Sequence, residues 1–166
     1  STDDILEAKK NNKVAFIFGF QNSAPIANDI YLIEKFFLQG IRFMQLTYNN
    51  QTALGGGCFE SKDSGVSRFG FQAIEEMNRL GMIVDLSHAG RQTCLDAIKF
   101  SSKPVAISHA NPIFFHKSLR NINDEVLIKL AKKNGFIGLS LYPYHLKNHG
   151  NCTIEEFCEM IKQLTN

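Results

Sequence analysis

Two kinds of segment alternate along the chain. Short, nearly continuous apolar runs occur at residues 14–20, 41–46, 82–86, 105–107 and 136–141, and such runs are typical of parallel strands covered on both faces. Between them, apolar residues recur every three or four positions, which predicts amphipathic helices. The helical positions are Ile30, Ile33, Phe36 and Phe37; Ile74, Met77 and Leu80; Cys94, Leu95 and Ile98; Val126, Leu127, Leu130 and Ala131; and Ile154, Phe157, Cys158, Ile161 and Leu164.

Five strand–helix units in a row predict an α/β fold with a parallel sheet and right-handed crossovers. Three helices end at a glycine (Gly40, Gly81 or Gly135) that leads directly into a strand. Glycine accepts the left-handed conformation that closes a helix. No linker, low-complexity stretch or charge block divides the chain, so residues 1–166 are expected to form a single domain.

Two architectures fit this order of elements. A five-stranded doubly wound sheet would be complete at 166 residues. A (β/α)8 barrel of the TIM type typically needs ~250 residues, so the chain would then be a partial barrel of about five βα units. The residues at the strand ends are needed to choose between them.

Two of the predicted strands have the same ending. Residues 84–88 read Val-Asp-Leu-Ser-His and residues 105–109 read Val-Ala-Ile-Ser-His. Because side chains alternate along a strand, His88 and His109 are expected to share one face at the carboxyl edge of the sheet, with the preceding serines directed away from them. Neighbouring strands lie ~4.8 Å apart, which suits two ligands of one Zn²⁺-like ion. A pair of hydrogen-bonded histidines is the alternative.

Other polar residues follow the predicted strands. Arg120 comes eleven residues after His109; a guanidinium there would hold a substrate carboxylate, but the spacing alone favours a solvated arginine before a helix capped by Asn123. Gln21 is expected to hydrogen-bond rather than to bridge metal ions. Tyr48 would either donate to a substrate oxygen or pack with its hydroxyl in water.

Two further motifs are weaker. Gly55-Gly56-Gly57 lacks the residues that complete a phosphate-binding loop, and a flexible loop over the site is expected instead. His145, His149 and Cys152 have metal-like spacing. The polar residues among them predict an exposed loop, which disfavours a metal site there.

Composition narrows the classes of function. Lys and Arg number 18 and Asp and Glu 16, a net charge of +2, which argues against a nucleic-acid partner. No apolar run approaches the ~20 residues of a membrane span, and the acidic start is unlike a signal peptide. Four cysteines without CxxC spacing are typical of reduced thiols, so a cytoplasmic location is expected.

Several of these motifs resemble the membrane (renal-type) dipeptidase family of zinc metallopeptidases. The resemblance is carried by residues 79–88, 104–111 and 119–121, and residues 19–22 and 44–49 are similar to the bacterial branch. It extends over nearly the whole chain and implies a partial TIM-type barrel related to the amidohydrolases. The implied activity is hydrolysis of a dipeptide or similar small amide by metal-activated water, at a site with one or two zinc ions.

The resemblance also implies roles for individual residues. His88 and His109 would bind one zinc ion, and Arg120 would bind the carboxylate of a dipeptide. Asn111, which closes the second of the shared segments, is a further substrate-binding candidate.

At two positions the chain departs from the family. A glutamate that bridges the zinc ions stands where this chain has Gln21, and a substrate-contacting histidine stands where it has Tyr48. We keep both residues as substrate-binding candidates. The departures introduce an alternative: a catalytically inactive relative that binds a small molecule or acts as a scaffold.

Finally, the resemblance implies missing parts. The family's His-x-Asp metal ligands belong to the first strand and its catalytic aspartate to the eighth. The chain is therefore expected to hold strands three to seven, to lack the second-site zinc ligands, and to have its general acid/base aspartate beyond Asn166. Alone it is expected to be inactive, and its open edges to pair with the rest of the barrel or with a second copy in a homodimer.

Overall fold

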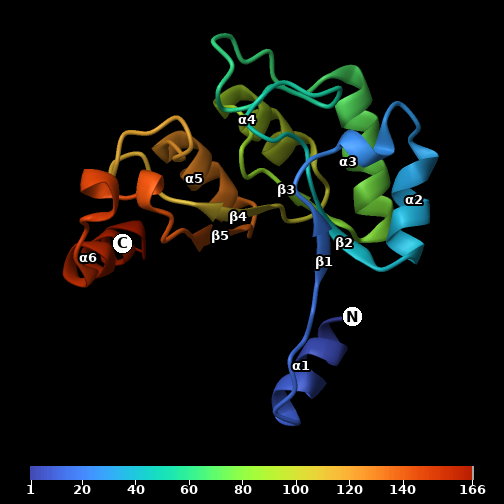
Figure 1. Cartoon of the computed structure of the whole chain (residues 1–166). Helices are drawn as coiled ribbons and strands as arrows, with labels where there is room; N and C mark the ends of the chain where they lie inside the picture. The colour runs from blue at the N-terminus through green and yellow to red at the C-terminus, as the bar shows by residue number, and fades with distance from the viewer. Residues whose placement is uncertain (166) are drawn as a thin grey trace.

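The computed structural model describes residues 1–165, apart from the side chains of Asn148 and His149. Five parallel strands form one sheet in the order β1-β2-β3-β4-β5 (Figure 1). The strands are β1 (Phe18–Phe20), β2 (Ile41–Gln45), β3 (Ile83–Asp85), β4 (Ala106–Ala110) and β5 (Phe136–Leu139). The helices that connect and follow them are α2 (Tyr31–Leu38), α3 (Arg68–Leu80), α4 (Arg91–Phe100), α5 (Asp124–Lys132) and α6 (Ile154–Thr165). The predicted α/β alternation is confirmed.

The strand order decides the architecture. A doubly wound sheet reverses its order at a switch point, whereas here each strand is added beside the preceding one and α2 to α5 pack against each other in chain order. The rings of Phe43 in β2 and Phe136 in β5 lie 6.5 Å apart although two strands separate them. A flat sheet would place those strands about 14 Å apart. The sheet is therefore curved like a barrel wall, and the doubly wound alternative is wrong.

The main core lies between the sheet and helices α2 to α5. The helix positions predicted from periodicity supply much of it, and they pack against the alternate strand residues Met44, Val84 and Ile107. A smaller cluster of Phe115, Leu146 and Met160 attaches α6 to the end of β5. Within residues 1–165, no helix combines the length and the apolar content that crossing a bilayer requires.

The first predicted strand is shorter and less covered than expected. The apolar run at 14–20 predicts a strand buried on both faces, but β1 contains three residues, and Val14 and Phe16 are 78% and 80% exposed. The reason is that β1 is an edge strand, paired only with β2. Before it lies α1 (Thr2–Lys10), which the apolar periodicity did not reveal because it has no buried residue. The Ser1–Asp4 capping box at its start was the sequence signal for this helix.

Two of the three predicted glycine helix ends have left-handed backbone. Gly40 has φ 104° and Gly81 has φ 80°, as expected. At the third end the left-handed residue is Asn134, with φ 55°. Gly135 is needed for a different reason, since a Cβ there would lie 2.6 Å from the carbonyl oxygen of Val105.

Candidate metal and substrate site

A cavity of about 680 Å³ lies at the carboxyl ends of the strands. It is lined by Gln21, Tyr48, Asn49, Phe59, His88, His109, Ser118, Arg120, Ser140, Tyr142, Tyr144 and His145. The structure thus brings together five of the six site residues predicted from the sequence. The sixth, Asn111, does not line the cavity.

The two strand-end histidines face each other across a short gap. The Nε2 atoms of His88 and His109 are 2.9 Å apart. His109 belongs to β4, but β3 already ends at Asp85, and His88 has a left-handed backbone with φ 65°. Strand alternation therefore does not set the direction of the His88 side chain.

The loop after β2 holds His88 in this conformation. Asn49 Oδ1 lies 2.6 Å from Nδ1 of His88, and the Tyr48 ring stacks on the imidazole with centroids 4.1 Å apart. The backbone carbonyl of His88 accepts hydrogen bonds from Thr47 Oγ1 at 3.1 Å and from the Cys58 backbone N–H at 2.9 Å. Sequence reasoning missed Asn49, because its partner is 39 residues away.

A buried carboxylate orients His109 through a serine. Ser108 Oγ is 2.9 Å from Nδ1 of His109 and also contacts Asp85 Oδ2. Ser87 Oγ donates to the other Asp85 oxygen at 2.8 Å and accepts the backbone N–H of His109 at 3.1 Å. The prediction that both serines point away from the histidines is wrong for Ser108, because the side chains tilt toward Asp85. An acidic residue inside an apolar strand was the signal for this network.

These contacts put a lone pair on each facing nitrogen. An amide oxygen only accepts, so His88 Nδ1 donates to Asn49. The Ser108 hydroxyl donates to the Asp85 carboxylate and can therefore accept from His109 Nδ1. Neither Nε2 then has a proton for the other. Two imidazoles that share Zn²⁺ at ~2.0–2.1 Å have nitrogens roughly 3–3.5 Å apart, so the observed 2.9 Å would have to widen slightly to admit the ion.

The protein environment favours the neutral form of both rings. Burial, with the charge of Arg120 next in importance, lowers the pKa of His88 to about 3. Burial and Arg120 also lower the pKa of His109. Neutral imidazole is the form that binds a metal ion. Among the described side chains, no group of three or more His, Cys, Asp or Glu residues is placed to hold a metal, so His88 and His109 form a pair.

Arg120 is buried beside the pair. Its residue surface is only 6% exposed, and Nη2 donates to the carbonyl oxygen of His109 at 3.0 Å. Nε and Nη1 are buried without a nitrogen or oxygen partner, and the Cys58 thiol lies beside the guanidinium. The solvated-arginine interpretation is therefore wrong. Because a buried guanidinium with unpaired donors is costly, this cavity is suited to an anion.

The remaining predicted residues occupy different places. Gln21 is exposed and lines the cavity, and Tyr48 is 43% exposed above His88. Asn111 is fully buried, and its side chain bonds the backbone of Ser140 and His145. Its role in substrate binding stays a prediction; in the structure it fixes the loop after β5.

The segment Gly55-Gly56-Gly57 is packed inside the protein, whereas a flexible loop was expected. Gly55, Gly56 and Gly57 are buried, and Gly56 O accepts the backbone N–H of Gly90 at 2.9 Å. A Cβ on Gly57 would lie 2.1 Å from the carbonyl oxygen of Asn49. The motif is therefore a packed support for the His88 loop, and the flexible-loop prediction is wrong.

Sequence reasoning underestimated His145. The expected exposed loop after β5 instead buries this histidine to 6% exposure, with Nδ1 2.9 Å from Ser140 Oγ. Burial, then Arg120 and His109, lowers the pKa of His145 to about 4. The side chain of His149, from the same predicted motif, lies outside the described residues.

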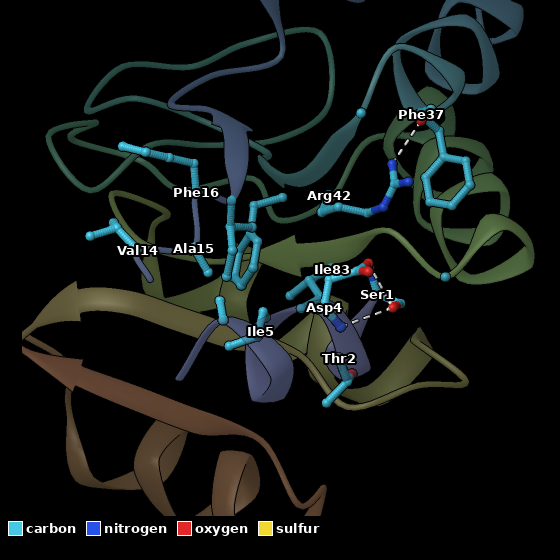
Figure 2. Close-up of a pocket in the computed structure, with 15 residues that line it drawn as sticks. Ser1, Thr2, Asp4, Ile5, Val14, Ala15, Phe16, Phe37, Arg42 and Ile83 are labelled. Atoms are coloured by element: carbon cyan, nitrogen blue, oxygen red, sulfur yellow. Dashed lines mark hydrogen bonds and ion pairs between the residues drawn. The ribbon is translucent and has the colours of Figure 1, made fainter. Parts of the chain in front are cut away.

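A second cavity lies at the opposite ends of the strands. It measures about 570 Å³ and is lined by α1, by residues 14–17 and by the starts of β2 and β3 (Figure 2). Its lining contains no histidine or cysteine, and the Asp4 carboxylate there accepts the Ser1 hydroxyl at 2.7 Å. The chemistry-bearing side chains belong to the first cavity.

Comparison with known proteins agrees with this geometry. A match to the family described as "Membrane dipeptidase (Peptidase family M19)" covers residues 1–166. The chain belongs to the membrane dipeptidase family. The resemblance inferred from the strand-end motifs is thereby confirmed.

Three relatives show how much of the family fold is present. The solved structure of an amidohydrolase from Pseudomonas aeruginosa is 38% identical to this chain and superimposes with a TM-score of 0.95. The match covers 100% of this chain and 51% of the amidohydrolase. A metallopeptidase from Rhodobacter sphaeroides, liganded with a phosphinate mimic of the dipeptide L-Ala-D-Ala, has a TM-score of 0.91 at 21% identity, over 99% and 50% of the two chains.

The third relative is an uncharacterised dipeptidase of Schizosaccharomyces pombe. It is 30% identical over 96% of this chain and 40% of its own length. The chain spans about half of the two solved structures and 40% of the curated relative, as a partial barrel requires.

Proposed function

We propose that this chain is part of a metal-dependent hydrolase of dipeptides or similar small amides. The observation that carries the proposal is the pair of Nε2 atoms 2.9 Å apart, each with its Nδ1 turned to a partner in the chain. Arg120, buried in the same cavity with unpaired donors, supports a substrate that has a carboxylate.

In this proposal His88 and His109 hold one Zn²⁺, with Asn49 and Ser108 orienting them. Bound there, the ion would supply the Lewis acidity that makes a water molecule nucleophilic toward an amide. Arg120 holds the substrate carboxylate at a fixed distance from the two histidines. The residue that transfers the proton, an aspartate, is expected in a part of the barrel beyond Asn166.

Gln21 and Tyr48 line the substrate cavity. An amide is a poor bridging ligand compared with a carboxylate, so Gln21 favours a site with one metal ion over one with two. Its carboxamide is suited to hydrogen-bonding the substrate. The Tyr48 ring stacks on His88, and its hydroxyl can donate to a substrate oxygen.

The longer protein that contains the remaining barrel, here called the full-length protein, is the active form in this proposal. The isolated chain is inactive, and its open edges pair with the missing parts or with a second copy as a homodimer. The cytoplasm is the proposed location.

The test is to purify the full-length protein, measure its zinc content and assay a panel of dipeptides. At least one tightly bound zinc ion per chain and hydrolysis that stops on chelation are expected. Metal-free protein that hydrolyses none of the panel would instead favour the second candidate, a catalytically inactive relative that binds a small molecule. The observations in favour of that candidate are the two departures from the family pattern, Gln21 in place of a bridging glutamate and Tyr48 in place of a substrate-contacting histidine.

A further inference from the structure

Three successive strand-end segments each bring a histidine to one cavity. His88 follows β3, His109 ends β4, and His145 lies in the loop after β5. The first two face each other through Nε2. Among the described side chains, His145 does not form a group with them that could hold a metal ion. We therefore consider a role for His145 other than metal binding.

The backbone of His145 is held firmly. Its carbonyl oxygen accepts two side-chain amides, Asn111 Nδ2 at 3.1 Å and Asn121 Nδ2 at 3.0 Å. Asn111 also bonds both the carbonyl and the N–H of Ser140, five residues earlier. Buried amides with several satisfied hydrogen bonds fix a loop in one conformation. The loop after β5 is thus built to hold the imidazole at this spot.

The contacts of the ring leave one polar atom for a ligand. Ser140 Oγ accepts the backbone N–H of Tyr142 at 3.2 Å and lies 2.9 Å from Nδ1 of His145. When this hydroxyl donates to Nδ1, the proton of the neutral ring is on Nε2. His145 then offers a neutral N–H donor in the cavity that Arg120 also lines.

The charges around the cavity indicate what these donors bind. Arg120 is the one Lys or Arg among the described lining residues, and none of them is Asp or Glu. A carboxylate can accept about four hydrogen bonds. One guanidinium does not supply all of them. A second, neutral donor completes its hydrogen bonds without adding a repelling charge beside the metal site.

We propose that His145 is a substrate-contacting residue, which donates from Nε2 to the carboxylate that Arg120 binds. The assignment rests on the proposed function and adds to it. It makes the loop after β5 a determinant of specificity for substrates with a free carboxylate, and it gives Asn111 and Asn121 a positioning role.

The experiment measures equilibrium binding by calorimetry to metal-stripped full-length protein. The two probes are L-Ala-L-Ala and alanine ethylamide, which keeps the amide bond and lacks the carboxylate. His145→Phe keeps an aromatic ring and has no donor, so it is expected to weaken dipeptide binding about tenfold, the size of one hydrogen bond to a charged group, and to change ethylamide binding less than about twofold. His116→Phe, at a histidine outside the cavity lining, is the matched control and should bind like the wild type.

Two results would overturn the role of His145: unchanged dipeptide affinity, or an equal loss for both probes. Zinc content measured on the reloaded variant should match the wild type, and a lower content would show a metal ligand instead. If His145→Phe fails to fold, Ser140→Ala serves in its place, because it keeps the imidazole and removes its orienting hydroxyl. About threefold weaker dipeptide binding is then expected, and an unchanged affinity would contradict the proposal.

The outcomes for the two proposals are separable. Dipeptide binding that depends on His145 in a protein that hydrolyses nothing would reject the hydrolase and keep this assignment. Full hydrolytic activity with unaltered kinetic constants in His145→Phe would reject this assignment and keep the hydrolase.

Discussion

At the scale of single residues, the hydrogen bonds of the two Nδ1 atoms determine how His88 and His109 face each other. His88 uses Nδ1 toward Asn49, and His109 uses Nδ1 toward Ser108, which Asp85 orients in turn. Such outer hydrogen bonds fix the tautomer and the ring direction of metal-binding histidines. The orientation of both Nε2 atoms is therefore set by Asn49, Ser108 and Asp85, none of which is itself a proposed metal ligand.

Replacing either histidine tests the metal assignment. His88→Ala or His109→Ala in the full-length protein should abolish binding of one metal ion, since a single imidazole from this pair remains, and should remove most activity. Elemental analysis of the purified variants measures the metal directly. A metal content equal to that of the wild type would defeat the assignment.

Arg120→Lys tests the carboxylate site. Lysine keeps the charge but cannot form the paired hydrogen bonds of a guanidinium. The Michaelis constant for dipeptides should rise about tenfold or more, while hydrolysis of alanine ethylamide should change little. An equal loss on both substrates would count against a carboxylate contact.

At the scale of elements, the loop after β2 connects the site to α4. The Asp63 carboxylate accepts the backbone N–H of Gln92 and both the N–H and the hydroxyl of Thr93. It therefore caps a helix whose own N-cap residue, Gly90, has no side chain to do so. The same loop donates the Cys58 N–H to His88.

Asp63→Ala should thus loosen both the helix and the His88 loop. A loss of about 1–2 kcal/mol in the free energy of unfolding is expected, measured by denaturant titration of the full-length protein. The exposed Asp3 of α1 provides the control, because Asp3→Ala should change stability by less than about 0.5 kcal/mol. Equal effects of the two substitutions would show that Asp63 is not a cap.

At the scale of the whole molecule, the curved sheet has two open edges. β1 and β5 each pair on one side only, and Phe18 and Phe136 on these strands are 62% and 49% exposed. Exposed strand edges and apolar side chains favour association. This chain spans only 51% and 40% of two of its relatives, so a longer chain can supply the rest of such a barrel.

The buried histidines predict how stability depends on pH. Burial, with Arg120, His109 and His116 nearby, lowers the pKa of His145 from 6.5 to about 4. Between these values the unfolded chain binds a proton that the folded chain does not. Stability is therefore complete above pH 6.5 and falls as the pH drops toward 4.

Denaturant midpoints of the metal-free full-length protein between pH 7 and pH 4 measure this dependence. His145→Gln should show a shallower fall, because glutamine does not titrate. His88 and His109 shift in the same direction and should account for part of the remaining slope. Identical slopes for the variant and the wild type would contradict the shifted pKa of His145.

The sequence by itself determined the features that depend on near neighbours. Apolar periodicity located α2 to α6 and the strands to within a few residues, and the Asn123 cap was correct. The repeated Ser-His strand endings and the Arg120 spacing identified the family. These signals are local, because helix faces, caps and strand ends are set by residues a few positions apart.

Only the tertiary structure decided the features that depend on distant contacts. The curvature of the sheet brings Phe43 of β2 and Phe136 of β5 together, although two strands lie between them. The left-handed backbone of His88 and its bond to Asn49 depend on a loop 39 residues earlier, and the burial of His145 depends on Asn111, 34 residues earlier. Hydrogen bonds across such separations leave no periodic pattern in the sequence, since each is made only when the fold brings its two partners together.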